Sequence, residues 1–209
     1  MHYFFNRYRA WILFFFVSAI SIILWIITLS GSVRSMYQFF PILGVLAWTT
    51  MWVHYVAGSI GKSTNGRRFT KWTEAVVLLL LVAHPGIFLV QRFLDTGLLP
   101  PASYVSYVGS LRAWAVVIAI AALATFLLYD VLKRFRRKLI VRGIWPYLSL
   151  LQAGAMIAIF VHGFTLGTSM NSAYFVLWWI LLGVILAPCL VLQVIRDFKL
   201  SFSQKDAEA

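Results

Sequence analysis

The sequence has little charge, and few of its charged residues are acidic. Only 11% of its 209 residues are Asp, Glu, Lys or Arg, and only six of these are Asp or Glu, whereas 62% of the chain is hydrophobic. A soluble domain carries roughly 25% charged residues, which keep its surface in water. The composition therefore excludes a soluble protein and leaves no part of the chain for a soluble catalytic module.

Cysteine is equally scarce, and a nucleotide-binding loop is missing. The single Cys189 can form neither an internal disulfide nor a CxxC metal or redox site, so we expect it to be a packing residue. The run Gly61-Lys62-Ser63-Thr64 resembles the end of a phosphate-binding loop. Val56 stands where that motif needs its first glycine, and the run follows an apolar block, not a strand. The pattern does not predict nucleotide binding.

What the sequence has instead is long hydrophobic runs, each near the 20 residues that an α-helix needs to cross a bilayer. The first follows Arg7 and Arg9 but is longer than a signal-peptide core and precedes no clear cleavage site, so we interpret it as a helix or signal anchor. We predict an all-α integral membrane protein, a six-helix bundle whose residues 1–209 form one domain. The predicted spans are 11–29, 38–60, 73–93, 112–132, 146–167 and 173–195.

The net charge of +12 has a topological explanation. Of the 18 Lys and Arg residues, two precede the first span, four lie between spans two and three, six between spans four and five, and three after the last. Basic residues concentrate in cytoplasmic loops, so both termini are predicted to be cytoplasmic and the protein to lie in a cell inner or plasma membrane. No nucleic-acid partner is expected. The basic run 133–138 also suits anionic lipid or an acidic partner.

Aromatic residues stand where the spans meet the predicted membrane interfaces. Trp and Tyr side chains favour this position because their rings are apolar and their N–H or O–H groups are polar. The expected interfacial belt contains Trp11, Tyr37, Trp72, Tyr104, Tyr107 and Trp145.

Three histidines lie inside the predicted spans, where an ionisable side chain is costly and usually functional. With a rise of about 1.5 Å per residue, His84 lies roughly 18 Å and His162 roughly 25 Å from the cytoplasmic ends of their helices. His54 lies only about 9 Å from its own cytoplasmic end. We expect His84 and His162 to share a level in the outer half of the membrane, and His54 to lie apart from them.

Two facing histidines on neighbouring helices are the ligand set of a b-type haem. Gly154 and Ala158 precede His162 by eight and four residues on one helical face, so we expect them to form a smooth surface against the haem. Hydrogen-bonded structural histidines remain the alternative. Zinc is a weaker hypothesis because no Cys, Asp or Glu occurs at a similar depth to complete its ligands.

Two segments resemble the ferric reductase-like transmembrane domain family. Residues 75–85 form an apolar run that ends in His-Pro, and residues 145–149 read Trp-Pro-Tyr-Leu-Ser, with a histidine thirteen residues after the last. Family members of the two-haem type carry a further histidine on each of these helices. The equivalent positions here hold Thr70 and Ser149, so the resemblance implies one haem b, with His84 and His162 as ligands of its iron.

The resemblance also implies a function as an electron-transfer subunit. Such proteins pass electrons from a cytoplasmic flavoprotein or a membrane quinol to an acceptor on the outer face, so quinone is a candidate cofactor and flavin is expected only on a partner. His54 is a candidate site for quinol binding or electron uptake. The rival hypothesis is a non-redox transporter or scaffold subunit, for which the prolines in the spans and Asp130 are the features to weigh.

Overall fold

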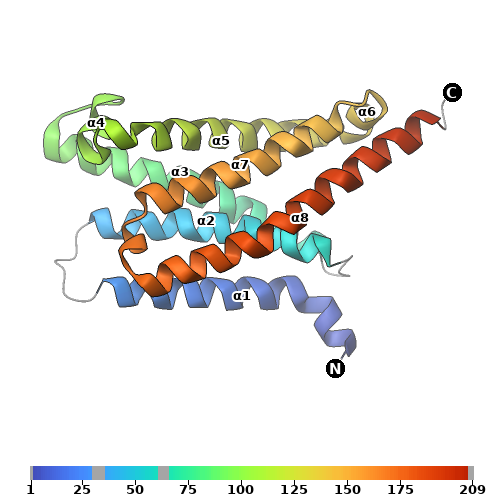
Figure 1. Ribbon diagram of the computed structural model, residues 1–209, viewed down its shortest axis with the longest axis horizontal. Helices are drawn as coiled ribbons and strands as arrows, with labels where there is room; N and C mark the ends of the chain where they lie inside the picture. Colours follow the sequence, from blue (N-terminus) through green and yellow to red (C-terminus); the bar gives the residue numbers. More distant parts are fainter. Residues whose placement is uncertain (1, 30–35, 61–65, 207–209) are drawn as a thin grey trace.

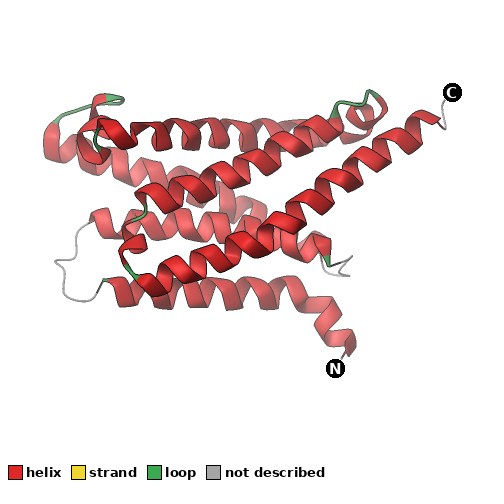
Figure 2. Ribbon diagram, in the orientation of Figure 1, coloured by secondary structure: helices red, strands yellow, loops and turns green. Residues whose placement is uncertain are grey.

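The structure is a computed structural model that describes residues 2–29, 36–60 and 66–206. Within these residues it contains helices and short connections but no strand (Figure 2). The elements are α1 (His2–Thr28), α2 (Met36–Ser59), α3 (Gly66–Thr96), α4 (Ala102–Val108), η1 (Ser110–Arg112), α5 (Ala113–Leu132), η2 (Lys133–Phe135), α6 (Arg136–Val141), α7 (Trp145–Leu166), η3 (Thr168–Asn171) and α8 (Ala173–Asp206).

Six of these helical segments are long and apolar enough to cross a membrane, which confirms the predicted number of spans. The segments are Tyr8–Thr28, Tyr37–Ser59, Arg68–Thr96, Ser110–Val141, Trp145–Leu166 and Ala173–Ser203. They form an elongated bundle in which α1 begins and α8 ends at the same end (Figure 1). η2 and α6 lie at this end too, and we call it the basic end (Figure 1). The chain is a multi-pass membrane protein.

Several helices extend beyond the apolar blocks that predicted them. α3 continues through Pro85 to Thr96 and stops where Gly97 adopts a φ of 67°, and α8 continues to Asp206. Hydropathy marks only the part of a helix that contacts lipid, whereas backbone hydrogen bonding continues until a residue such as glycine ends it. The Gly61–Thr64 pattern lies outside the described residues.

α2 occupies the centre of the bundle and packs against α1, α3, α7 and α8. Half of the residues in the most apolar stretch of α2 are buried, a larger share than in any of the other five spans. Small side chains let neighbouring backbones approach closely in a membrane protein, and α2 buries Ala47, Thr49 and Thr50 within about one turn. The two threonine hydroxyls donate back to the Leu46 carbonyl, so they add no unpaired polar group.

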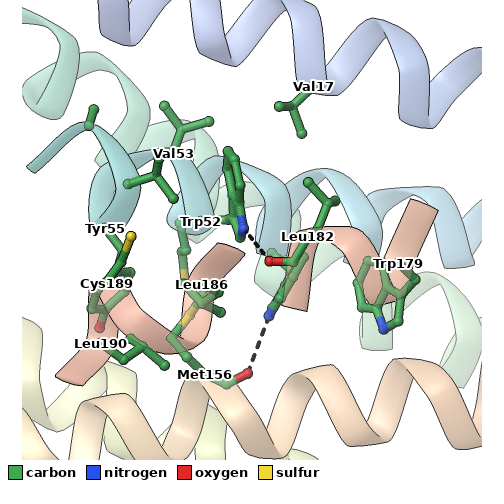
Figure 3. Close-up of a cluster of buried hydrophobic side chains, with 14 of the residues drawn as sticks. Val17, Trp52, Val53, Tyr55, Met156, Trp179, Leu182, Leu186, Cys189 and Leu190 are labelled. Carbon is green, nitrogen blue, oxygen red and sulfur yellow. Dashed lines mark hydrogen bonds between the residues drawn. The ribbon is translucent and has the colours of Figure 1, made fainter. Parts of the chain in front are cut away.

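Tryptophan side chains connect α2 to the helices around it. The Trp52 indole N–H donates to the Leu182 carbonyl at 2.8 Å, and that of Trp48 donates to the Met156 carbonyl at 3.3 Å (Figure 3). Trp179 donates in the same way to Phe160 at 3.2 Å. Each large ring is buried and its one polar group is paired, as the bilayer interior requires.

The hydrogen bond from Trp52 to Leu182 should contribute to the free energy of unfolding, which can be tested by substitution. Trp52→Phe keeps an aromatic ring but removes the N–H, which leaves the Leu182 carbonyl without its second partner. We expect thermal unfolding in detergent to show a loss of about 1 kcal/mol. Trp72→Phe, at a position that is 62% exposed, should leave the unfolding temperature unchanged. Equal effects of the two substitutions would contradict a role for the hydrogen bond.

Candidate functional site

The structure brings His84 of α3 and His162 of α7 together inside the bundle. Their ring centroids lie 6.4 Å apart, and the ring planes are nearly perpendicular, at 89°. α3 packs most extensively on α2, and α7 most extensively on α5. The two histidines therefore face each other across the boundary between two helix pairs.

Each histidine is fixed by a backbone carbonyl of the helix that pairs with its own. His84 Nδ1 lies 2.7 Å from the Phe40 carbonyl oxygen on α2, and His162 Nδ1 lies 2.9 Å from the Ala115 carbonyl oxygen on α5. A carbonyl only accepts, so each Nδ1 carries the proton and donates it. A neutral imidazole that carries its proton on Nδ1 has its free lone pair on Nε2. In this tautomer Nε2 can ligate a metal.

A cavity of about 180 Å³ lies beside the two rings and has room for roughly a dozen water molecules. Its walls are apolar and come from α2, α3, α5, α7, η3 and α8, with α4 beside them. Representative wall residues are Leu81, Phe88, Val116, Ile120, Ile159 and Leu166. The site therefore combines two nitrogen donors with an apolar cavity.

Gly44 on α2 makes room for the His84 ring. A Cβ atom built at Gly44 would lie 3.0 Å from Cε1 and 3.1 Å from Nδ1 of His84, closer than ordinary contacts. The sequence analysis did not identify Gly44, Phe40 or Ala115 as site residues. Only the glycine within an otherwise apolar block was a visible signal, since a backbone carbonyl carries no sequence signature.

Gly154 and Ala158 are not brought to this cavity. Neither lines it, and a Cβ atom built at Gly154 meets nothing within 4 Å. A helix turns about 100° per residue, so steps of four and eight residues drift by roughly 40° and 80° from the direction of His162. That drift carries Gly154 to an exposed face, and Ala158 packs against the hydrophobic core instead.

His54 lies apart from the pair. Its Nε2 is 2.6 Å from the Thr73 hydroxyl oxygen, and that hydroxyl also lies 2.8 Å from the Phe69 carbonyl oxygen. Thr73 precedes His84 by eleven residues on α3, which corresponds to about 16 Å along the helix. His54 is thus held by α3 on the side of the basic end, as its sequence position suggested.

The positions that replace the family's inner histidines carry small hydroxyl side chains. Ser149 is 2% exposed, and its Oγ has no hydrogen-bond partner among the described residues. Thr70 is half-buried, and its carbonyl lies 3.3 Å from the Thr73 hydroxyl.

An aromatic cover, formed by Tyr37, Phe88, Tyr104 and Tyr107, borders the cavity at the end opposite the basic one. The Phe88 ring stacks on Tyr104 of α4 with centroids 5.5 Å apart, and Tyr107 stacks on Tyr37 at 5.4 Å. Tyr37 donates to the Asp95 carboxylate, which ties α2 to the end of α3. Burial raises the pKa of Tyr104 above its ordinary value, so its hydroxyl stays neutral.

The polar residues weighed for the transporter hypothesis are accounted for locally. Asp130 forms an ion pair with Lys133, and the same ammonium lies 2.8 Å from Glu74 of α3. Both carboxylates are about half exposed, at 58% and 46%. Cys189 is buried, with its sulfur 3.1 Å from the Ser59 hydroxyl oxygen. None of these residues forms a carboxylate site in the middle of the bundle.

In the part of the chain that the structure describes, no three side chains of His, Cys, Asp or Glu gather closely enough to hold a metal ion. A metal at His84 and His162 would take its other ligands from a bound group. Comparison of the chain with protein-family models, curated proteins and solved structures finds no match. The assignment of a function therefore depends on the residues of the site.

The contact between His54 and Thr73 can be tested by stability. Thr73→Val removes the hydroxyl and leaves the buried imidazole without that partner, so we expect a loss of about 1–3 kcal/mol on unfolding in detergent. Thr125→Val is the matched control, because the Thr125 hydroxyl makes the same type of bond to Ala121 but is exposed. A Thr73→Val protein as stable as the control would show that the bond contributes nothing.

Proposed function

We propose that this protein is a transmembrane electron-transfer subunit that holds one haem b between His84 and His162. The observation that carries the proposal is the pair of facing imidazoles, 6.4 Å apart, each with Nδ1 fixed by a carbonyl of a different helix. Electrons would come from a cytoplasmic flavoprotein or a quinol and pass to an acceptor on the outer face. The resemblance to ferric reductase-like proteins supports the same function.

The distance between the rings suits a single metal atom. A transition metal lies about 2.0–2.1 Å from an imidazole nitrogen, so two rings on opposite sides of one metal have their centres roughly 6 Å apart. The observed separation of 6.4 Å agrees with this value. A haem held by both histidines would favour electron transfer over oxygen binding.

The protein's own residues would orient and shield the site. The Phe40 and Ala115 carbonyls hold each ring in one tautomer, which fixes the direction of the Nε2 lone pair. The apolar walls and the aromatic cover would surround a bound group with mostly apolar side chains. The haem would supply a one-electron change at iron, whose potential depends on these ligands and on burial.

Aromatic contacts support an electron exit at the end opposite the basic one. Phe40 lies 5.3 Å from the His84 ring and 5.1 Å from Phe88, and Phe88 in turn stacks on Tyr104 of the cover. The excess of Lys and Arg at the basic end supports a cytoplasmic location for that end and for both termini. Electrons would then leave the protein on the outer side of the membrane.

The haem ligands can be tested by spectroscopy of the purified protein. We expect a sharp Soret band, with α and β bands after dithionite reduction. His84→Ala and His162→Ala should each lose most of the haem, because one axial ligand disappears. Full haem content in both variants would contradict the assignment. A wild-type protein that stays colourless when expressed with added haem would favour the transporter or scaffold hypothesis.

Gly44 provides a second test with a matched control. Gly44→Val places a side chain where the His84 ring lies, so haem affinity should fall roughly tenfold, the scale of effects on residues that orient a ligand. Gly154→Val makes the same substitution at a position where a Cβ meets nothing, and haem content should be unchanged. Haem loss in Gly154→Val alone would instead support the original expectation for that residue.

We further propose that His54 takes part in quinol binding or electron uptake near the basic end. Its contact with Thr73 supports this role, because Thr73 lies between the basic end and His84 on α3. His54→Gln should slow quinol-driven haem reduction in membranes while haem content stays constant. Normal reduction kinetics in that variant would leave His54 with a structural role only.

A further inference from the structure

A second cavity, of about 370 Å³, lies at the basic end and shares no wall residue with the cavity beside the histidines. Its walls come from five long or short helices, α2, α5, α6, α7 and α8, and from η2. Unlike the first cavity, it is lined by charged and hydrogen-bonding side chains. The residues that matter here are Tyr55, Lys133, Arg136, Trp145, Arg196 and Asp197.

The charge of these walls is positive, with three basic side chains against one carboxylate. Lys133 is balanced by Glu74 and Asp130, which lie outside the cavity. Arg136 reaches the Asp197 carboxylate at 3.4 Å, which is long for a charge-assisted bond. Arg196 has no ion-pair partner among the residues described and donates only to the Gly58 carbonyl, at 3.3 Å.

Two residues of the cavity wall also carry buried donors that lack partners. Tyr55 is 7% exposed and Trp145 is 2% exposed, yet the Tyr55 hydroxyl and the Trp145 indole N–H form no hydrogen bond in the described part of the chain. A buried polar group left unpaired costs about 1–3 kcal/mol, so such groups usually have a reason. The Arg136 guanidinium lies over the Trp145 ring, 5.1 Å from its centre.

Trp145 was expected at the lipid interface, but the structure buries it in this wall. A tryptophan in the interfacial belt would direct its N–H to water or lipid. Here Arg136 of α6 and Tyr129 of α5 each lie 5.1 Å from the Trp145 ring, and the indole N–H is without a partner among the described residues. An arginine without a carboxylate and two unpaired neutral donors together form a site that needs hydrogen-bond acceptors and negative charge.

We propose that this cavity binds a phosphate group. Phosphate offers acceptor oxygens in several directions at once, which suits donors that come from α2, α6, α7 and α8. Guanidinium groups bind phosphate in a forked geometry, and Arg136 and Arg196 supply two of them. Basic pockets between membrane helices on the cytoplasmic side also bind the headgroups of anionic lipids. The phosphate can belong to such a headgroup or to free phosphate.

The test is thermal unfolding of the full chain in a non-ionic detergent without phosphate, at constant ionic strength. Three additions are compared: phosphatidylglycerol, diacylglycerol and inorganic phosphate. A ligand that binds only the folded protein raises the unfolding temperature in a concentration-dependent manner. Stabilisation by phosphatidylglycerol alone identifies the lipid headgroup, and stabilisation by inorganic phosphate identifies the free anion. No stabilisation by either, or equal stabilisation by diacylglycerol, which has no phosphate, overturns the proposal.

Three substitutions connect the effect to this cavity. Each of them removes one hydrogen-bond donor: Arg196→Gln, Tyr55→Phe and Trp145→Phe. Each should raise the ligand concentration that gives half of the stabilisation about tenfold. Arg137→Gln is the control, because Arg137 neighbours Arg136 on the same exposed basic segment but does not line the cavity. If Arg137→Gln weakens binding as much as Arg196→Gln, the effect is general surface attraction and the proposal fails.

The unpaired Tyr55 hydroxyl can also be tested in the protein without added ligand. Because the Tyr55 hydroxyl has no partner in the described chain, Tyr55→Phe should leave the ligand-free protein as stable as wild type or more stable. A clear loss of stability would show that the hydroxyl already has a protein partner, and would remove it from the proposed site. Neither experiment depends on haem, so both remain valid if the electron-transfer function is wrong.

Discussion

Side-chain N–H groups that donate to backbone carbonyls of neighbouring helices hold this bundle together. In a bilayer, apolar contact with another helix gains little over apolar contact with lipid, so packing and hydrogen bonds between helices take a larger share of the specificity. A helical carbonyl has two lone pairs and uses one within its helix. The N–H of a tryptophan or histidine can therefore donate to such a carbonyl while the carbonyl keeps its hydrogen bond within the helix.

The candidate site uses the same type of bond as the scaffold. Trp48 and Trp52 attach α2 to α7 and α8, while His84 and His162 attach α3 to α2 and α7 to α5. Since the same bonds that join the helices also set the histidine tautomers, the orientation of the two rings is a consequence of helix packing. A small rotation of α2 would move both the Phe40 carbonyl and Gly44 away from His84.

The sequence predicted the spans well because the cost of placing a residue in lipid is local and can be summed along the chain. The depth of the histidines followed in the same way, since helical rise is fixed by backbone geometry. Rotation about the helix axis is set by neighbours that are distant in sequence. For that reason the positions of Gly44 and of the carbonyls were not predicted, and neither were the exposed face of Gly154 and the burial of Trp145.

The two cavities differ in the polar groups that lack a hydrogen-bond partner, and this difference follows from the residues of their walls. Beside His84 and His162 the walls are apolar, so the available groups are nitrogen lone pairs, which suit a metal. At the basic end the available groups are donors and a cationic arginine, which suit an anion. A bundle with lone pairs in its interior and unpaired donors at one end can hold two chemically distinct ligands without competition between them.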